Sequence, residues 1–207
     1  KTPYRTFKTR EELENLFKNE PELAEMPLLF CEQTTFNVEE WEKLAKKPKL
    51  KNYILIYKLN TSNLIFDFAR KLSKLTGRKI VALNFDVVDQ MKTPDIKGVY
   101  SASVEEFLGY IKYADYVVTN SFHGTAFSII FHKEFYVEAL QKDFKPNDRV
   151  ESLLCLTGLD ECKVKTLEDC RVNVNRDFNF ADDQIRKQYI KTNQYFERVL
   201  NEDGRSF

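Results

Sequence analysis

The chain has 207 residues, 43% hydrophobic and 31% charged, so it can bury the core of one large domain or of two small ones. Its 32 basic and 32 acidic side chains give a formal net charge of zero, whereas nucleic-acid-binding proteins usually show a basic excess. No apolar run approaches the roughly 20 residues that cross a bilayer, and no signal peptide is visible. We therefore expect a globular protein that binds no nucleic acid and does not span a membrane.

The first 50 residues are predicted to be mostly helical. Residues 9–19 and 37–47 each begin with a capping-box pattern, in which the capping side chain is followed three positions later by Glu. Residues 26–36 change from apolar to polar along their length and are interpreted as a short strand. We interpret residues 1–50 as a linker or a remnant of a preceding lobe, because the pattern changes after them.

Strands and helices alternate in residues 51–207, which we expect to form one domain. Short apolar runs rich in β-branched and aromatic residues predict strands at 53–59, 79–85, 98–102, 116–119 and 135–139. Amphipathic segments with capping and stop signals predict helices at 62–77, 103–114, 121–133 and 148–159, and a long final helix at 179–202. This alternation predicts an α/β, Rossmann-like parallel sheet with helices on both faces.

The cysteines and the common catalytic motifs argue against several chemistries. The four cysteines show no metal-binding spacing and only two histidines exist to help them, so no metal site is expected. We expect free thiols, with a Cys162–Cys170 bridge as the open alternative. No Walker loop, GxGxxG, HExxH or GxSxG pattern occurs, which argues against the common nucleotide, zinc and serine chemistries.

Both histidines lie within residues 113–137, and His123 stands where a strand turns into a helix. The strand 116–119 should end at the carboxyl edge of the sheet, where doubly wound folds bind ligands. Asn120, Ser121 and His123 should therefore line that edge. The backbone N–H groups of this segment belong to the first turn of the next helix, which attracts phosphate or carboxylate groups.

A second interpretation of the same segment stays open at this point. Gly124 lets either a ligand or a neighbouring strand approach closely. Asn120 or Ser121 could be no more than the cap of the helix, and His123 could be a hydrogen-bonded core residue. The residues by themselves do not decide between a ligand site and a packing motif.

Three further polar residues are predicted at the same edge. Lys58 and Asn60 follow the apolar run Tyr53–Tyr57, and Arg149 lies in the first turn of the helix after the last strand. Cationic groups and N–H donors are what a phosphate or a carboxylate requires. Lys58 and Arg149 could equally be solvated surface residues, and this alternative also stays open.

The segment ADYVVTNSFHGTAFSIIFHKEF, residues 114–135, resembles the signature of the polysaccharide pyruvyl transferase family, and TNSFHGTAFSIIF is its specific part. The similarity extends from about Val38 to Cys162. It implies a GT-B-like two-lobed fold in which this chain is the C-terminal lobe. The sequence departs from the family in two places. The N-terminal lobe of the family is not found here, so we expect either a fragment whose partner is an absent N-terminal lobe or an unusual segment in the first 36 residues. The second departure is HKEF at residues 132–135, where members often have NKPF.

The resemblance implies transfer of a pyruvyl group from phosphoenolpyruvate to two hydroxyls of a sugar, as a cyclic ketal, in bacterial cell-surface polysaccharide biosynthesis. Phosphoenolpyruvate is then the donor substrate, no cofactor is implied, and the acceptor is a sugar or a lipid-linked oligosaccharide. We expect a cytoplasmic protein, with a peripheral position at the inner membrane face as the alternative, because the donor is cytoplasmic.

Each candidate residue has an expected role in that reaction. Ketal formation requires an acid that donates a proton near neutral pH, and we predict His123 for this step. The predicted donor-binding residues are Asn120, Ser121, Gly124, Arg149, Lys58 and Asn60. Asp86 and Asp89 either orient a sugar hydroxyl or are solvated loop acids. The alternative functions are a GT-B nucleotide-sugar glycosyltransferase and a non-catalytic sugar-binding lobe.

Overall fold

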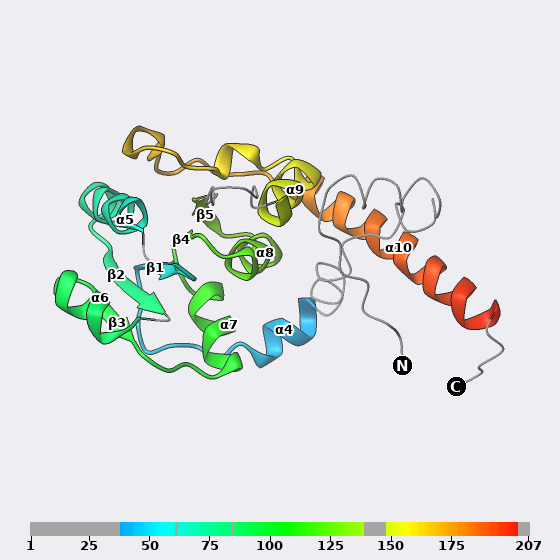
Figure 1. Cartoon of the computed structure of the whole chain (residues 1–207), viewed down its shortest axis with the longest axis horizontal. Helices are drawn as coiled ribbons and strands as arrows, with labels where there is room; N and C mark the ends of the chain where they lie inside the picture. The colour runs from blue at the N-terminus through cyan, green and yellow to red at the C-terminus, as the bar shows by residue number, and fades with distance from the viewer. Residues whose placement is uncertain (1–37, 61, 84, 139–147, 203–207) are drawn as a thin grey trace, which may run out of the picture. The chain divides into compact units, whose positions relative to one another are not determined.

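The computed structural model describes residues 38–60, 62–83, 85–138 and 148–202. The chain divides into two compact units, one formed by residues 37–184 and the other by residues 1–36 together with 185–207. All five described strands belong to the first unit (Figure 1). The helix and the strand expected at residues 9–19 and 26–36 lie outside the described residues, so they and the division near residue 50 stay predictions.

Five parallel strands form one sheet in the order β3-β2-β1-β4-β5. Its centre is β1 (Tyr53–Tyr57), which pairs with β2 (Lys79–Leu83) on one side and with β4 (Tyr116–Thr119) on the other. The edge strands are β3 (Lys97–Val99) and β5 (Glu134–Val137). The predicted Rossmann-like parallel sheet is therefore confirmed, and its strand order reverses between β1 and β4.

The helices follow the predicted alternation with one addition. The described α-helices are α4 (Val38–Leu44), α5 (Asn63–Thr76), α6 (Val87–Lys92), α7 (Val104–Lys112), α8 (Phe122–Ile130), α9 (Asp148–Thr157) and α10 (Asn179–Glu202). The addition is α6, because residues 87–92 had been expected to form a loop. Asp86 caps α6 by accepting a hydrogen bond from the N–H of Asp89, whose side chain bonds back to the cap. No helix of the described part is long and apolar enough to cross a bilayer.

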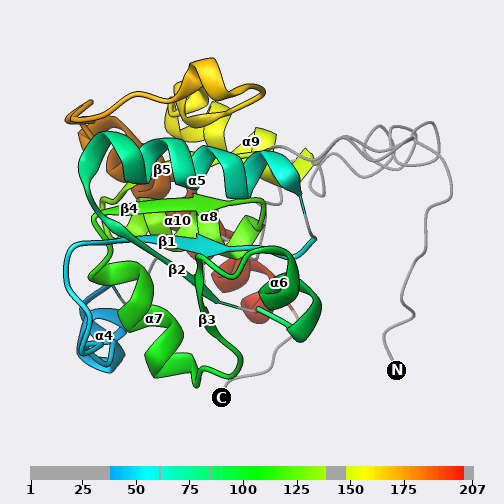
Figure 2. The same ribbon diagram turned by 90° about the vertical axis from the view of Figure 1, so that its left-hand side faces the viewer.

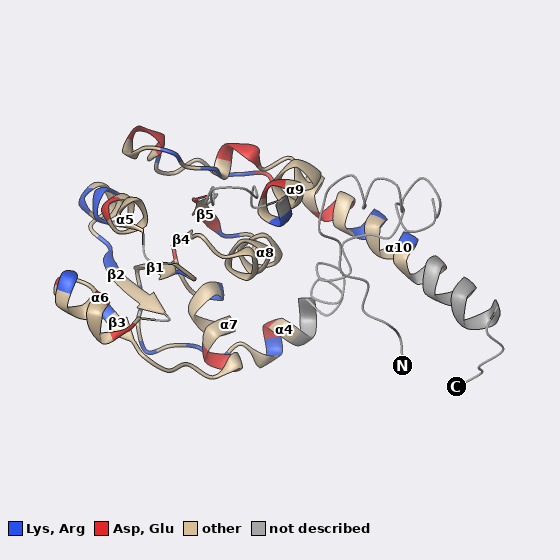
Figure 3. Cartoon of the chain, viewed as in Figure 1, with Lys and Arg blue, Asp and Glu red and all other residues tan. Residues whose placement is uncertain are grey.

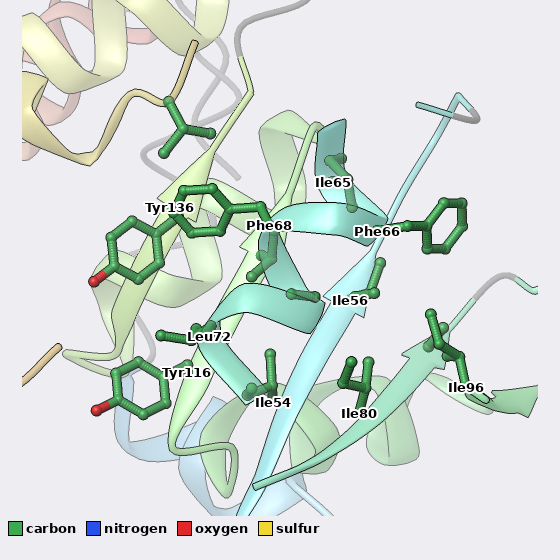
Figure 4. Packing of buried hydrophobic residues seen from close by; sticks show 14 of the residues in the cluster. Ile54, Ile56, Ile65, Phe66, Phe68, Leu72, Ile80, Ile96, Tyr116 and Tyr136 are labelled. Atoms are coloured by element: carbon green, nitrogen blue, oxygen red, sulfur yellow. The ribbon is translucent and has the colours of Figure 1, made fainter. Parts of the chain in front are cut away.

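One face of the sheet packs on α5. Successive side chains of a strand point to opposite faces, so Ile54 and Ile56 of β1 share one face. They are fully buried there with Ile65, Phe68 and Leu72 of α5, as Figure 4 shows. Each such side chain contributes about 1.5–3 kcal/mol through its removal from water. This hydrophobic contact fixes α5 to the centre of the sheet.

The opposite face carries α7 and α8. Tyr53 and Tyr57 point toward this side, where the hydroxyl of Tyr53 donates to the carbonyl of Tyr110 at 2.7 Å. The ring of Tyr57 meets Phe107 of α7 edge to face, with ring centroids 4.9 Å apart. Figure 2 shows α5 and α7 on the two faces of the sheet. The sheet is therefore covered on both sides, as predicted.

Two smaller features complete the first unit. The free thiols include Cys155, Cys162 and Cys170, so the Cys162–Cys170 bridge that the sequence left open does not form. Arg176 is almost fully buried and bonds to the carboxylate of Glu134, which ties the segment before α10 to β5. The bond fixes this segment against the edge of the sheet.

The chain after α4 approaches α7 very closely at Gly109. The N–H of Lys46 donates to the carbonyl of Glu105 at 2.9 Å, which brings the backbone of Lys46 onto the surface of α7. A Cβ atom placed on Gly109 would lie 1.8 Å from the carbonyl oxygen of Lys46. Only a residue without a side chain allows this backbone-to-backbone contact.

We predict that Gly109→Ala destabilises the protein by about 1–2 kcal/mol, because the clash outweighs the gain of about 1 kcal/mol in helix propensity. Urea unfolding measures the difference. Val104→Ala is the control, since Val104 lies on the same helix and is 64% exposed. Unchanged or increased stability of Gly109→Ala would contradict the packing role.

Candidate functional site

The carboxyl ends of β1 and β4 form the point at which the sheet changes direction. The chain leaves β1 toward α5 on one face and leaves β4 toward α8 on the other, because these helices cover opposite faces. Doubly wound sheets bind ligands at this point, since the two connections diverge and leave a crevice between them. Figure 2 shows α5 and α6 both beginning at this edge.

Asn120 connects the two sides of that edge. Its side-chain oxygen accepts from the N–H of Leu59 at 2.9 Å, and its amide nitrogen donates to the carbonyl of Asn60 at 2.8 Å. The residue is only 2% exposed, whereas Asn60 is exposed. Asn120 therefore positions the segment after β1, and the side chain of Asn60 stays accessible at the rim. A donor contact by either residue stays a prediction.

Ser121 and Gly124 fix the start of α8 against the strand ends. The hydroxyl of Ser121 accepts from the N–H of Gly124 at 3.4 Å, so Ser121 is the N-cap of α8. A Cβ atom on Gly124 would lie 2.4 Å from Oγ1 of Thr119 and 3.0 Å from the ring of Tyr57. Both residues thus have packing roles, which agrees with the second interpretation of the motif and leaves their donor contacts as predictions.

His123 and Arg149 approach the same buried ring from different helices. Phe122 is 4% exposed, its ring centroid lies 5.7 Å from that of His123, and the guanidinium carbon of Arg149 lies 5.1 Å from its centroid. His123 and Arg149 are themselves exposed. A guanidinium at this distance from an aromatic face is held there by about 0.5–1 kcal/mol. Two side chains that lie far apart in the sequence therefore contact the same aromatic ring.

The electrostatics of this turn favour an anion. α8 contains no Lys, Arg, Asp or Glu, and Figure 3 therefore draws it in tan throughout. Helix geometry leaves the N–H groups of Phe122 and His123 without acceptors inside α8, and the aligned peptide dipoles make this end positive. Arg149 adds a full positive charge beside it. Phosphate or carboxylate groups would be attracted to the turn Ser121–Gly124, called the SFHG turn below.

Lys58 forms a buried ion pair, whereas binding of the donor would require an accessible ammonium group. Its ammonium lies 2.7 Å from Oδ2 of Asp89, and the two side chains are 5% and 2% exposed. An anionic ligand at Lys58 would have to displace a buried carboxylate. We therefore assign Lys58 a structural role. The expectation that Asp89 is a solvated loop acid was wrong, because Asp89 lies inside α6, is buried and is paired. A contact with a sugar hydroxyl stays a prediction.

Glu138 is a residue of this edge that the sequence did not single out. It directly follows β5, and its Oε1 accepts from the hydroxyl of Ser62, before α5, at 2.9 Å. Its other oxygen, Oε2, is buried with no hydrogen-bond partner in the described part of the chain. The only available signal was its place after a strand, which many solvated acids share. The α5 side of the edge thus carries the Glu138 carboxyl, and the α8 side carries the Arg149 guanidinium.

No group of three or more His, Cys, Asp or Glu side chains that could hold a metal ion occurs among the residues that the structure describes.

We predict that Lys58→Met destabilises the protein by about 3–5 kcal/mol, because it leaves the charge of Asp89 buried without its partner. Chemical unfolding measures this loss. The double variant Lys58→Met/Asp89→Asn should recover part of it, since the buried charge is gone. The control is Lys74→Met on the exposed surface of α5. If Lys58→Met were as stable as Lys74→Met, a structural role for the Lys58–Asp89 pair would be contradicted.

Comparison with solved structures agrees with the fold. A putative UDP-N-acetylglucosamine 2-epimerase from Listeria monocytogenes matches with a TM-score of 0.50 at 10% identity, over 82% of this chain and 52% of that one. The UDP-GlcNAc 2-epimerase from Methanocaldococcus jannaschii matches with a TM-score of 0.45 at 12% identity, over 76% and 49%. The chain spans about half the length of these proteins. The likeness to the Listeria protein agrees with one Rossmann-like lobe of a GT-B-like fold.

Comparison of the sequence identifies the family. No curated protein matches the chain. The sequence model of the family described as polysaccharide pyruvyl transferase matches residues 13–141, which include β1 to β5 and the SFHG turn. This match covers well over half of the chain, so the protein belongs to the polysaccharide pyruvyl transferase family.

Proposed function

We propose that this chain binds phosphoenolpyruvate at the SFHG turn and transfers its pyruvyl group to two hydroxyls of a sugar as a cyclic ketal. The observation that supports this most directly is the packing of both His123 and Arg149 against the ring of Phe122. One of these side chains can transfer a proton near neutral pH and the other can bind an anion. Both are exposed at the edge where folds of this type bind ligands.

The donor has two anionic groups, and the site offers groups for both. A guanidinium binds a carboxylate or a phosphate through two parallel hydrogen bonds, which suits Arg149. The free N–H groups of the first turn of α8 suit the other anion, and the helix dipole adds to the attraction. We propose that the carboxylate and the phosphate divide these two partners between them and that the methylene carbon then faces His123.

The chemistry proceeds in four steps. His123 donates a proton to the methylene carbon, and C2 becomes cation-like. A sugar hydroxyl adds to C2 and loses its proton, inorganic phosphate then leaves, and a second hydroxyl closes the ring with loss of its proton. The first step needs the protonated imidazole of His123. The products are the cyclic ketal and inorganic phosphate.

The remaining parts of the reaction extend beyond this chain. The family implies a sugar acceptor. We propose a cell-surface polysaccharide precursor, free or lipid-linked, as the acceptor and a bacterial cytoplasm as the setting, since phosphoenolpyruvate is made there. Because the chain spans about half the length of the proteins that it resembles in fold, we further propose that an N-terminal lobe completes the active site.

We predict that phosphoenolpyruvate raises the melting temperature of the protein and that His123→Ala reduces the rise. A ligand that binds only the native state at about 100 times its Kd adds roughly 2.7 kcal/mol of stability. Thermal unfolding with and without millimolar phosphoenolpyruvate measures the effect. UDP and GDP are tested in parallel, because the same fold also serves nucleotide sugars.

His132→Ala is the matched control for this experiment. His132 is the other histidine of the sequence, lies just beyond the opposite end of α8 and pairs with Asp182 at 2.9 Å. Its loss should lower the melting temperature without ligand and leave the ligand-induced rise intact. A rise with nucleotides alone would contradict pyruvyl transfer in favour of a glycosyltransferase, and no rise with any ligand would contradict a donor site in this chain.

We predict that Arg149→Ala weakens phosphoenolpyruvate binding about 10-fold to 100-fold, because hydrogen bonds to charged groups contribute about 1.5–3 kcal/mol. Calorimetric titration measures the Kd. The Kd of Arg149→Lys should lie between those of the unmodified protein and Arg149→Ala, because lysine keeps the positive charge but cannot form two parallel hydrogen bonds. Arg78→Ala is the control, since Arg78 also lies over an aromatic ring, Tyr116, but at the amino edge of the sheet. Equal affinities of Arg149→Ala and Arg78→Ala would exclude Arg149 from the donor site.

A further inference from the structure

A second binding surface opens at the same edge of the sheet, on the side of α7. It is a cavity of about 430 Å³, bordered by the ends of β1 and β2 and by the segment between β3 and α7. This volume lies within the range of about 300–1,000 Å³ that is typical of small-molecule sites. Nothing in the proposed donor chemistry uses it.

The lining of this cavity is aromatic and hydroxylic. Tyr57, Tyr100 and Phe107 supply ring surface, and Ser101 and Ser103 supply hydroxyl groups. None of the described residues that line it carries a charge, so it offers no partner for a phosphate or a carboxylate. A neutral ligand with an apolar face and several hydroxyls fits this lining, because hydroxyl groups both donate and accept hydrogen bonds. A sugar ring has these properties.

Tyr57 joins the cavity to the SFHG turn. Its ring is one wall of the cavity, and the same ring lies against Gly124 in the first turn of α8. A ligand in the cavity would therefore be separated from the SFHG turn by a single side chain. This is the arrangement that a reaction between an anionic donor and a neutral acceptor needs.

We propose that this cavity, called the Tyr100 pocket below, binds the sugar ring of the acceptor. Tyr100 is 59% exposed, and its hydroxyl donates to Oε1 of Gln90 on α6 at 3.3 Å, which orients its ring at the cavity. The aromatic rings receive the C–H face of the sugar, and the serine hydroxyls bind its rim. The role of the pocket in the reaction rests on the proposed function, whereas binding of a sugar can be measured without it.

The test is saturation-transfer NMR on the whole chain with neutral free sugars, namely galactose, glucose, mannose and N-acetylglucosamine. We expect at least one of them to bind, and we expect Tyr100→Ala to weaken its binding roughly tenfold through loss of the ring. Tyr100→Phe keeps the ring and should retain most of the affinity. Because Tyr100 is more than half exposed, these substitutions leave the core intact.

Leu75→Ala is the control, since Leu75 is 55% exposed and lies in the last turn of α5, at the opposite edge of the sheet. It should bind sugar like the unmodified protein. The inference is overturned if no sugar binds or if Tyr100→Ala binds as well as Leu75→Ala. It is also overturned if UMP displaces the sugar in a Tyr100-dependent way, because the pocket would then be a nucleobase site.

Titration with phosphoenolpyruvate separates this inference from the proposed function. If sugar binding depends on Tyr100 but phosphoenolpyruvate has no effect that depends on His123, the sugar pocket is supported and the proposed donor site is refuted. If phosphoenolpyruvate has an effect that depends on His123 but no sugar binds, the donor site is supported and the sugar pocket is refuted. If both proposals hold, Tyr100→Ala leaves phosphoenolpyruvate binding unchanged.

Discussion

The close contact of α8 with the ends of β1 and β4 is the constraint on which the rest of the site depends. Gly124 has no room for a Cβ atom, because Thr119 and Tyr57 occupy the space in which it would lie. This contact brings the first turn of α8 to the point where the strand order reverses. Asn120 completes the arrangement by holding the segment after β1 through two hydrogen bonds. The motif is therefore a packing device first, and its exposed side chain, His123, is the part left for chemistry.

Charge is distributed at this edge according to burial. The buried cation, Lys58, is neutralised by Asp89, so it adds little to the field at the SFHG turn. The exposed cation, Arg149, lies over a ring that contributes dispersion and a quadrupole but no opposite charge. Arg149 therefore keeps its capacity to bind an anion. On the far side of Tyr57 the described lining of the cavity is uncharged, which is why we propose separate sites for an anionic and a neutral substrate at this edge.

Much of the fold follows from local patterns. The strands and helices from residue 53 onward were predicted because buried parallel strands are continuous apolar runs and because helices carry caps and stops. Among the α-helices the exception was α6, whose six residues are too few to show a helical period. Its capping pattern, Asp86 followed three residues later by Asp89, was the usable signal. Because α6 was not predicted, the burial of Asp89 and its pairing with Lys58 could not be predicted either, since both depend on where that helix packs. The two short 3-10 helices at Asp160–Cys162 and Leu167–Asp169 were also not predicted.

The sequence by itself determined the fold class, the family resemblance and the segment that forms the turn, because these depend on short-range patterns. Only the tertiary structure decided which polar side chains remain accessible. Lys58 and Arg149 are both cations predicted at one edge, yet the first is buried against a carboxylate and the second is exposed over Phe122. The Tyr100 pocket is likewise built from three separate segments. Burial and pairing arise from contacts between residues far apart in the chain, and a sequence read along its length does not contain those distances.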